Sequence, residues 1–115
     1  MKLMMHILRE NKKLNIDNTK IGPMAIIQKL DEEFKEVVKA IIDYNNNKTL
    51  NNLKEILTET FDLIQVCILI LWRYNRQALD FDEPNLIQEI NIKHKDKLID
   101  REWIIETGIE IDIKE

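Results

Sequence analysis

The residues best suited to chemistry in this sequence are carboxylates, and they occur in two short patterns. One is E-E-F-K-E at residues 32–36, and the other is E-T-F-D at residues 59–62. Residues three apart on a helix are neighbours, so Glu33 with Glu36, and Glu59 with Asp62, can each reach one cation. Oxygen ligands without a nearby Cys or His suit Mg²⁺ or Mn²⁺ better than Zn²⁺. Such an ion polarises phosphoryl oxygens and lowers the pKa of a bound water.

Helices must position these acids. Apolar residues recur at helical spacing from about Pro23 to Tyr44 and again from about Leu50 to Gln77. Proline is well suited to a first helical turn. The Asn-rich residues 45–48 favour a turn, and Thr49 or Asn51 can cap the second helix. A third, weaker pattern predicts a helix over 85–103, after a loop at 80–84.

The acids fall beside the apolar faces of the two predicted helices. With Leu30 at zero, the apolar stripe of the first helix centres near +25°, whereas Glu33 lies at about −60° and Glu36 at about −120°. On the second helix, Val66 and Leu69 follow Asp62 by one and two turns on the same face. The short turn favours antiparallel packing, which lets the acidic pairs face each other. Four carboxylates in one place repel unless a cation lies between them.

The second half of the second helix is apolar nearly all round, from Val66 to Trp72. A helix that is apolar on every side is expected to be buried on every side, and one antiparallel partner cannot cover it. We therefore predict an all-α fold resembling a four-helix bundle, whose core is shared in a homodimer or homotetramer. Cys67 lies inside this run and is expected to be a buried structural thiol.

The two ends of the chain are harder to interpret. Residues 1–21 form a poorly defined N-terminal segment, in which Met1 to Leu14 could be a short helix. Residues 104–115 change period, because isoleucines alternate with charged residues from Ile109 to Ile113, and this indicates a β-hairpin or an extended arm. With these ends included, residues 1–115 are expected to form a single domain.

The composition excludes several classes of function. The net charge of −4 argues against binding to a nucleic-acid polymer, which needs a basic surface. The longest apolar stretch, residues 63–72, is shorter than the roughly 20 residues of a membrane span. No P-loop pattern and no secretory signal is visible. We therefore expect a cytoplasmic protein without a membrane partner.

The two acidic patterns together are similar to a known motif. The order E-E-x-x-E, a spacer, and then E-x-x-D resembles the MazG-type all-α nucleoside triphosphate pyrophosphatases, which are relatives of phosphoribosyl-ATP pyrophosphohydrolase and the dimeric dUTPases. Residues 32–36 match the first element, and residues 59–62 match the second. Residues 95–101, K-D-K-L-I-D-R, more weakly resemble a phosphate-binding segment of these proteins. The resemblance covers about residues 23–103.

The resemblance implies a reaction in which a nucleoside triphosphate and water give a nucleoside monophosphate and pyrophosphate, as part of nucleotide-pool housekeeping. It implies Mg²⁺, with Mn²⁺ as a substitute, held by Glu33, Glu36, Glu59 and Asp62. Glu32 would orient water, and either Glu32 or Glu36 would take its proton.

Three basic residues are candidates for binding the substrate. Lys97 and Arg101 match the phosphate-binding positions of the resemblance, and they share a helical face. Lys29 lies one turn before Glu33, where it could contact a phosphate or form a salt bridge with Glu33. Two alternatives remain open: a non-catalytic helical oligomerisation protein, and a nucleotide-binding protein with a degenerate site.

Overall fold

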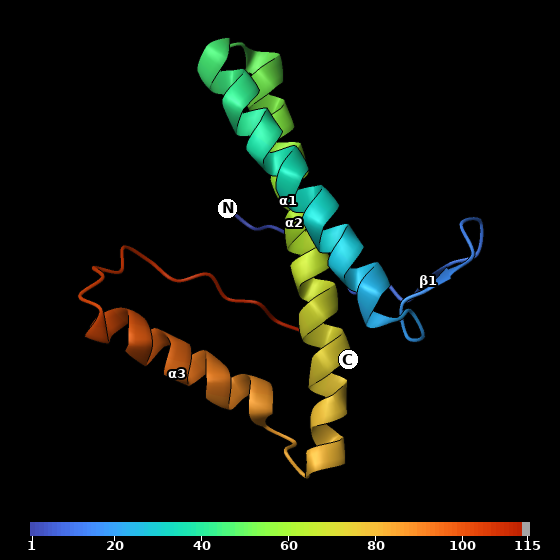
Figure 1. Ribbon diagram of the computed structural model, residues 1–115. Coiled ribbons are helices and arrows are strands. Elements are labelled where there is room, and N and C mark those ends of the chain that lie inside the picture. Colours follow the sequence, from blue (N-terminus) through green and yellow to red (C-terminus); the bar gives the residue numbers. More distant parts are fainter. Residues whose placement is uncertain (114–115) are drawn as a thin grey trace.

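The structure, a computed structural model, describes residues 1–113 and is mostly helical (Figure 1). A two-stranded antiparallel sheet comes first and three helices follow. The elements in chain order are β1 (Glu10–Asn11), β2 (Ile16–Asp17), α1 (Pro23–Asn46), α2 (Leu50–Gln77), the 3₁₀ turn η1 (Ala78–Phe81) and α3 (Leu86–Asp100).

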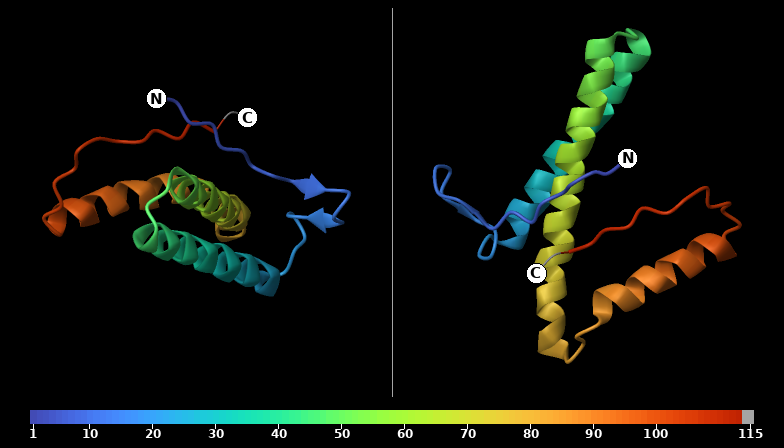
Figure 2. Two further views of the ribbon diagram at one scale, coloured as in Figure 1. Left: turned by 90° about the horizontal axis from the view of Figure 1, so that it is seen from above. Right: turned by 180° about the vertical axis from the view of Figure 1, so that it is seen from behind.

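The long helices α1 and α2 pack side by side in an antiparallel hairpin (Figures 1 and 2). Gly22 precedes α1 in an extended conformation, and Pro23 occupies the first turn, where its missing N–H costs nothing. The hydroxyl of Thr49 accepts a hydrogen bond from the backbone N–H of Asn52 and so caps α2. Both helices were predicted from periodicity; α2 has the predicted bounds, and α1 continues two residues beyond Tyr44.

The prediction of a helix within Met1 to Leu14 is wrong. Residues 1–9 have no regular structure, and Glu10 pairs with Asp17 while Asn11 pairs with Ile16. The side chain of Asn11 accepts a hydrogen bond from the backbone N–H of Leu14. Such a local bond competes with the helical backbone pattern and favours a turn.

Two long-range hydrogen bonds attach the N-terminal segment to α2. The amide of Gln65 donates to the backbone carbonyl of His6 at 2.6 Å, and Nη1 of Arg73 donates to the backbone carbonyl of Asn18 at 2.7 Å. The N-terminal segment therefore crosses α2, and the β1–β2 hairpin projects away from α2 beside the first residues of α1 (Figure 2).

Helix α3 is shorter than predicted and points away from the α1–α2 hairpin. It ends at Asp100, after which Glu102 adopts a left-handed conformation, with a φ of 65°. The N–H of Glu102 bonds to the carbonyl of Ile99, and that of Trp103 to the carbonyl of Leu98, which is the Schellman pattern of helix ends. Away from η1, α3 diverges from α2, and the tail returns as an extended arm (Figures 1 and 2).

The predicted alternative of a C-terminal β-hairpin is not found in residues 104–113, which contain no strand; residues 114 and 115 lie outside the described part. The alternating isoleucines have no neighbouring strand with which to pair. In the described part of the chain, no helix is both long and apolar enough to cross a membrane.

The core of a single chain is small, and no residue in it is completely enclosed. Its buried apolar residues are Ile26, Ala40, Val66, Leu69 and Ala78. The expectation for Cys67 was wrong, since this thiol is exposed, and Leu71 in the same run is 53 % exposed. An apolar run predicts that its side chains are buried, but it does not say which element covers them. Here α1 covers only one side of α2, so the side chains on the other sides stay exposed in a single chain.

Candidate metal centre

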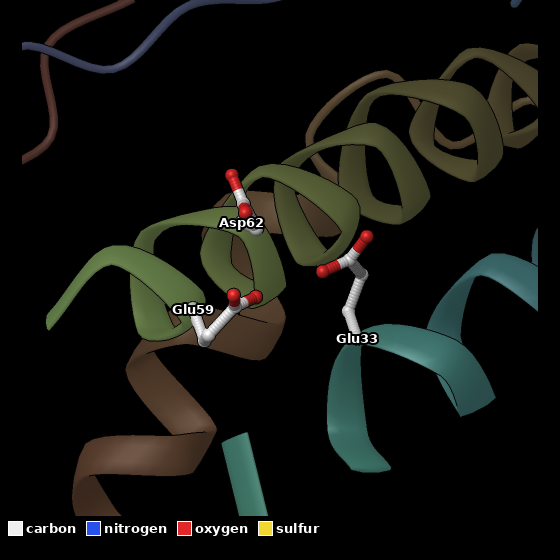
Figure 3. A group of neighbouring side chains, drawn as sticks. All are labelled: Glu33, Glu59 and Asp62. Carbon is white, nitrogen blue, oxygen red and sulfur yellow. The ribbon is translucent and has the colours of Figure 1, made fainter. Parts of the chain in front are cut away.

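Three carboxylates from two helices meet in the middle of the α1–α2 hairpin. Glu33 lies on α1, whereas Glu59 and Asp62 lie one turn apart on α2, and one oxygen of each is within 4.8 Å of the others. Figure 3 shows the Glu33 side chain extending from α1 toward the two acids of α2. The antiparallel packing thus produces the predicted encounter of the acidic patterns.

Glu36 lies against this group, but Glu32 does not belong to it. The side chain of Glu36 is within hydrogen-bonding reach of both Glu33 and Glu59. Glu36 is exposed, which leaves it accessible to water. Glu32 is also exposed, and it is absent from the cluster of possible metal ligands. The helical period accounts for this difference, because Glu32 is rotated by 100° from Glu33.

Two oxygens of the cluster lack a partner. Oε2 of Glu33 and Oε2 of Glu59 are shielded from solvent and accept no hydrogen bond within the described residues. Leaving a shielded acceptor unpaired is unfavourable, and more so when the group is charged. The arrangement therefore needs a proton or a cation to compensate these oxygens.

The pKa values of two of these acids are raised. The pKa of Glu59 rises from 4.5 to about 7, first because its protonated form donates a hydrogen bond to Glu36, and then because of desolvation and the charges of neighbouring acids. The pKa of Glu33 is raised chiefly by desolvation and then by the charge of Glu36, while Lys29 acts in the opposite direction. Proximity and partial burial therefore destabilise the ionised cluster.

The donor set fits a hard divalent cation. Mg²⁺ binds oxygens at about 2.1 Å, so two ligands on opposite sides of the ion are about 4.2 Å apart, a spread comparable to that of the three carboxylates. Glu33, Glu59 and Asp62 would hold the ion; Glu36, which was predicted as a fourth ligand, lies beside Glu33 and Glu59 but is not one of the three acids that converge. The unpaired oxygens of Glu33 and Glu59 are the observation that supports this fit.

Of the three basic residues predicted to bind the substrate, one lies near the carboxylates and two lie away from them. Lys29 is close enough to influence Glu33, although the two form no ion pair within residues 1–113. Lys97 and Arg101 lie at the far end of α3, exposed and away from the α1–α2 hairpin (Figure 1). One chain therefore does not bring this pair to the carboxylates.

The raised pKa of Glu59 predicts how the metal-free protein responds to pH. Between about pH 4.5 and pH 7 the folded protein keeps a proton that the unfolded chain has released, so the free energy of unfolding should fall as pH rises through this window. Thermal unfolding in EDTA should show a lower Tm at pH 8 than at pH 5, and Glu59→Gln should reduce the slope. A Tm that is constant or rises over this range would contradict the prediction.

The sequence also contains a feature that was not recognised from its pattern. Arg73 and Arg76 are three apart near the end of α2, and together with Thr19 and Gln77 they line an open hollow. The two arginines have the same three-residue spacing as the acidic pairs. Arg73 also lies on nearly the same side of α2 as Asp62, because eleven residues rotate the helix by only about 20° beyond three full turns. The position of residues 18 and 19 beside α2, however, follows only from the structure.

Comparisons with known proteins give no match, whether to family models, to curated proteins or to solved structures. Geometry and chemistry must therefore support any function assigned to the carboxylate cluster.

Proposed function

We propose that the protein is a Mg²⁺-dependent pyrophosphohydrolase of nucleoside triphosphates, with a MazG-type arrangement of ligands. The observation that carries this proposal is the meeting of Glu33 with Glu59 and Asp62, which includes two shielded and unpaired oxygens. Ordinary acids on a helix surface would remain solvated, whereas one oxygen of Glu33 and one of Glu59 are shielded from solvent where the two helices face each other; Asp62 is exposed. The resemblance of residues 32–36 and 59–62 to the family motif adds the class of substrate.

The carboxylates have distinct parts in this proposal. Glu33, Glu59 and Asp62 would hold the cation, which when bound would neutralise charge on the triphosphate and lower the pKa of a water. Glu36 touches two of the ligands and is exposed, so it is the better placed acid to accept the proton of the attacking water. Glu32, the other candidate base, lies outside the cluster.

The proposal includes a homo-oligomer, because a single chain exposes too much surface. A compact protein of 13.8 kDa is expected to expose about 6,600 Å², whereas this chain exposes 10406 Å². The radius of gyration is 16.9 Å, compared with about 13.4 Å for a compact domain of this length. The excess is about 3,800 Å² per chain, or about 7,600 Å² for a dimer, whereas obligate homodimer interfaces bury roughly 2,000 to more than 5,000 Å² counted over both partners.

In an oligomer, Lys97 and Arg101 of one subunit could contact the carboxylate cluster of another. Lys97 and Arg101 project from a helix that makes sparse contact with its own hairpin. A triphosphate and four carboxylates carry more negative charge than one or two Mg²⁺ ions can offset. In the proposed assembly, α3 of one chain lies over the carboxylates of another and supplies the remaining positive charge.

Replacing Arg101 with Ala tests the role of this pair. If Arg101 grips phosphate oxygens, kcat/KM should fall by about 10- to 1,000-fold, which corresponds to about 1.4–4 kcal/mol of transition-state stabilisation. The Tm should change little, because Arg101 is exposed and makes no ion pair in the described part of the chain. Lys95→Ala, on the opposite side of α3, is the control. An Arg101→Ala protein with wild-type kcat/KM removes this residue from the site.

A panel of canonical and modified nucleoside triphosphates tests the activity itself. With Mg²⁺, at least one ribo- or deoxyribonucleotide should give monophosphate and pyrophosphate in equal amounts, and EDTA should abolish the release. Nucleotide binding without pyrophosphate would indicate a degenerate site. Neither binding nor turnover would favour a non-catalytic oligomerisation protein, for which the large exposed apolar surface is the supporting observation.

A further inference from the structure

A second, basic site lies near the end of α2, away from the carboxylates. Arg73, Arg76, Thr19 and Gln77 line an open hollow of about 290 Å³. Eleven residues separate Asp62 from Arg73, which corresponds to about 16 Å along the helix. The hollow is therefore separate from the metal centre, although it lies on the same side of α2.

Both arginines are held in position, while most of their donors have no partner within residues 1–113. Nη1 of Arg73 donates to the carbonyl of Asn18 at 2.7 Å, which leaves the other guanidinium N–H groups available. The guanidinium of Arg76 lies 4.9 Å from the centre of the Trp72 ring, a cation–π contact that uses no hydrogen bond. An arginine that is already positioned loses less freedom when it binds a ligand.

Among residues 1–113, no acid lines the hollow to neutralise the pair. Asp17 is near in sequence, but its Oδ1 accepts hydrogen bonds from both the hydroxyl and the N–H of Thr19, and its Oδ2 lies 3.9 Å from Lys20. Two like charges three apart on a helix repel each other. Arg76 gains some compensation from the α2 C-terminus, but Arg73 lies a further turn back.

We propose that this hollow binds a phosphate group. Two guanidinium groups match the charge of a phosphate, about −1.5 to −2 at neutral pH, better than that of a single carboxylate. The planar fork of arginine also fits two phosphate oxygens at once. The source of the group is either a free anion, such as inorganic phosphate or pyrophosphate, or the phosphate of a nucleotide. This site does not depend on the proposed hydrolysis.

Calorimetric titration in EDTA tests the proposal without metal or turnover. Inorganic phosphate, pyrophosphate and adenosine monophosphate should be titrated separately into the full-length protein. At least one should bind saturably, and Arg76→Gln should weaken its binding by about 10- to 100-fold. Lys48→Gln, which removes a positive charge from the turn between α1 and α2, should leave the affinity unchanged. Tighter binding of the monophosphate identifies a nucleotide as the source, and tighter binding of phosphate or pyrophosphate identifies a free anion.

The Arg76→Lys variant distinguishes a loss of anion binding from a loss of folding. This variant keeps the charge but loses the planar fork, so its affinity should fall between those of the wild type and Arg76→Gln, while circular dichroism of all variants stays the same. The proposal is overturned if none of the three anions binds saturably, if Arg76→Gln binds as tightly as the wild type, or if citrate binds as tightly as phosphate.

Discussion

Replacing Glu33 with Gln is expected to reduce Mg²⁺-dependent pyrophosphate release by about 10³-fold or more, a loss of at least about 4 kcal/mol of transition-state stabilisation. Glu33 is the carboxylate that α1 contributes to the three-residue cluster, and one of its oxygens is shielded and unpaired. An amide has nearly the same shape but no charge, so it binds a hard cation weakly. Steady-state kinetics over a range of Mg²⁺ concentrations measures the loss.

The same substitution should have an opposite effect on the metal-free protein. Because desolvation, and then repulsion by Glu36, raise the pKa of Glu33, removing its charge should increase the Tm in EDTA at pH 8. Glu55→Gln is the matched control, since Glu55 is an exposed acid on α2 one turn before Glu59. If Glu33→Gln keeps full activity, the ligand assignment is wrong; if it unfolds the chain, the acid has a structural role instead.

Replacing Leu71 with Asp is expected to dissociate the oligomer and destabilise the fold. Leu71 lies in the apolar run of α2 yet is 53 % exposed in a single chain. On the surface of a monomer such a change would shift stability by about 0.5 kcal/mol or less. In a shared core it would bury a carboxylate, so the dissociation constant should increase at least about 100-fold, or by about 2.7 kcal/mol.

Multi-angle light scattering at micromolar concentrations measures this change, together with thermal unfolding at several protein concentrations. Leu71→Met is the control, because it keeps an apolar side chain of similar volume. A wild-type protein that is a stable monomer at these concentrations would remove the proposed oligomer and, with it, the delivery of Lys97 and Arg101 by a partner.

The helices of the hairpin and the meeting of its acids were predictable because both depend on local rules. The 3.6-residue period locates Glu33, Glu59 and Asp62 on their helices, and a short turn requires the helices to be antiparallel. The cap at Thr49 and the start at Pro23 follow from backbone chemistry. Glu36 was predicted as a fourth ligand from its three-residue spacing from Glu33; it lies beside Glu33 and Glu59 but outside the group of three acids that converge.

The remaining features depend on packing that no local pattern encodes. The N-terminal segment is attached to α2 through residues 6 and 18, whose partners are 59 and 55 positions away. The direction of α3 depends on η1 and on the left-handed backbone of Asp82. The periodicity of α3 alone therefore could not predict where Lys97 and Arg101 lie relative to the acids. The burial of Cys67 was predicted from an apolar run whose other sides a single chain leaves uncovered.

Binding of Mn²⁺ to the metal-free protein tests the central claim most directly, because it requires neither a substrate nor knowledge of the base. Electron paramagnetic resonance reports the free Mn²⁺ that remains as protein is added. The wild type should remove at least one Mn²⁺ per chain, Mg²⁺ should release it, and Glu33→Gln should abolish the binding. A wild type that binds no Mn²⁺, or a Glu33→Gln variant that binds it equally well, would contradict the assignment of these carboxylates as a metal centre.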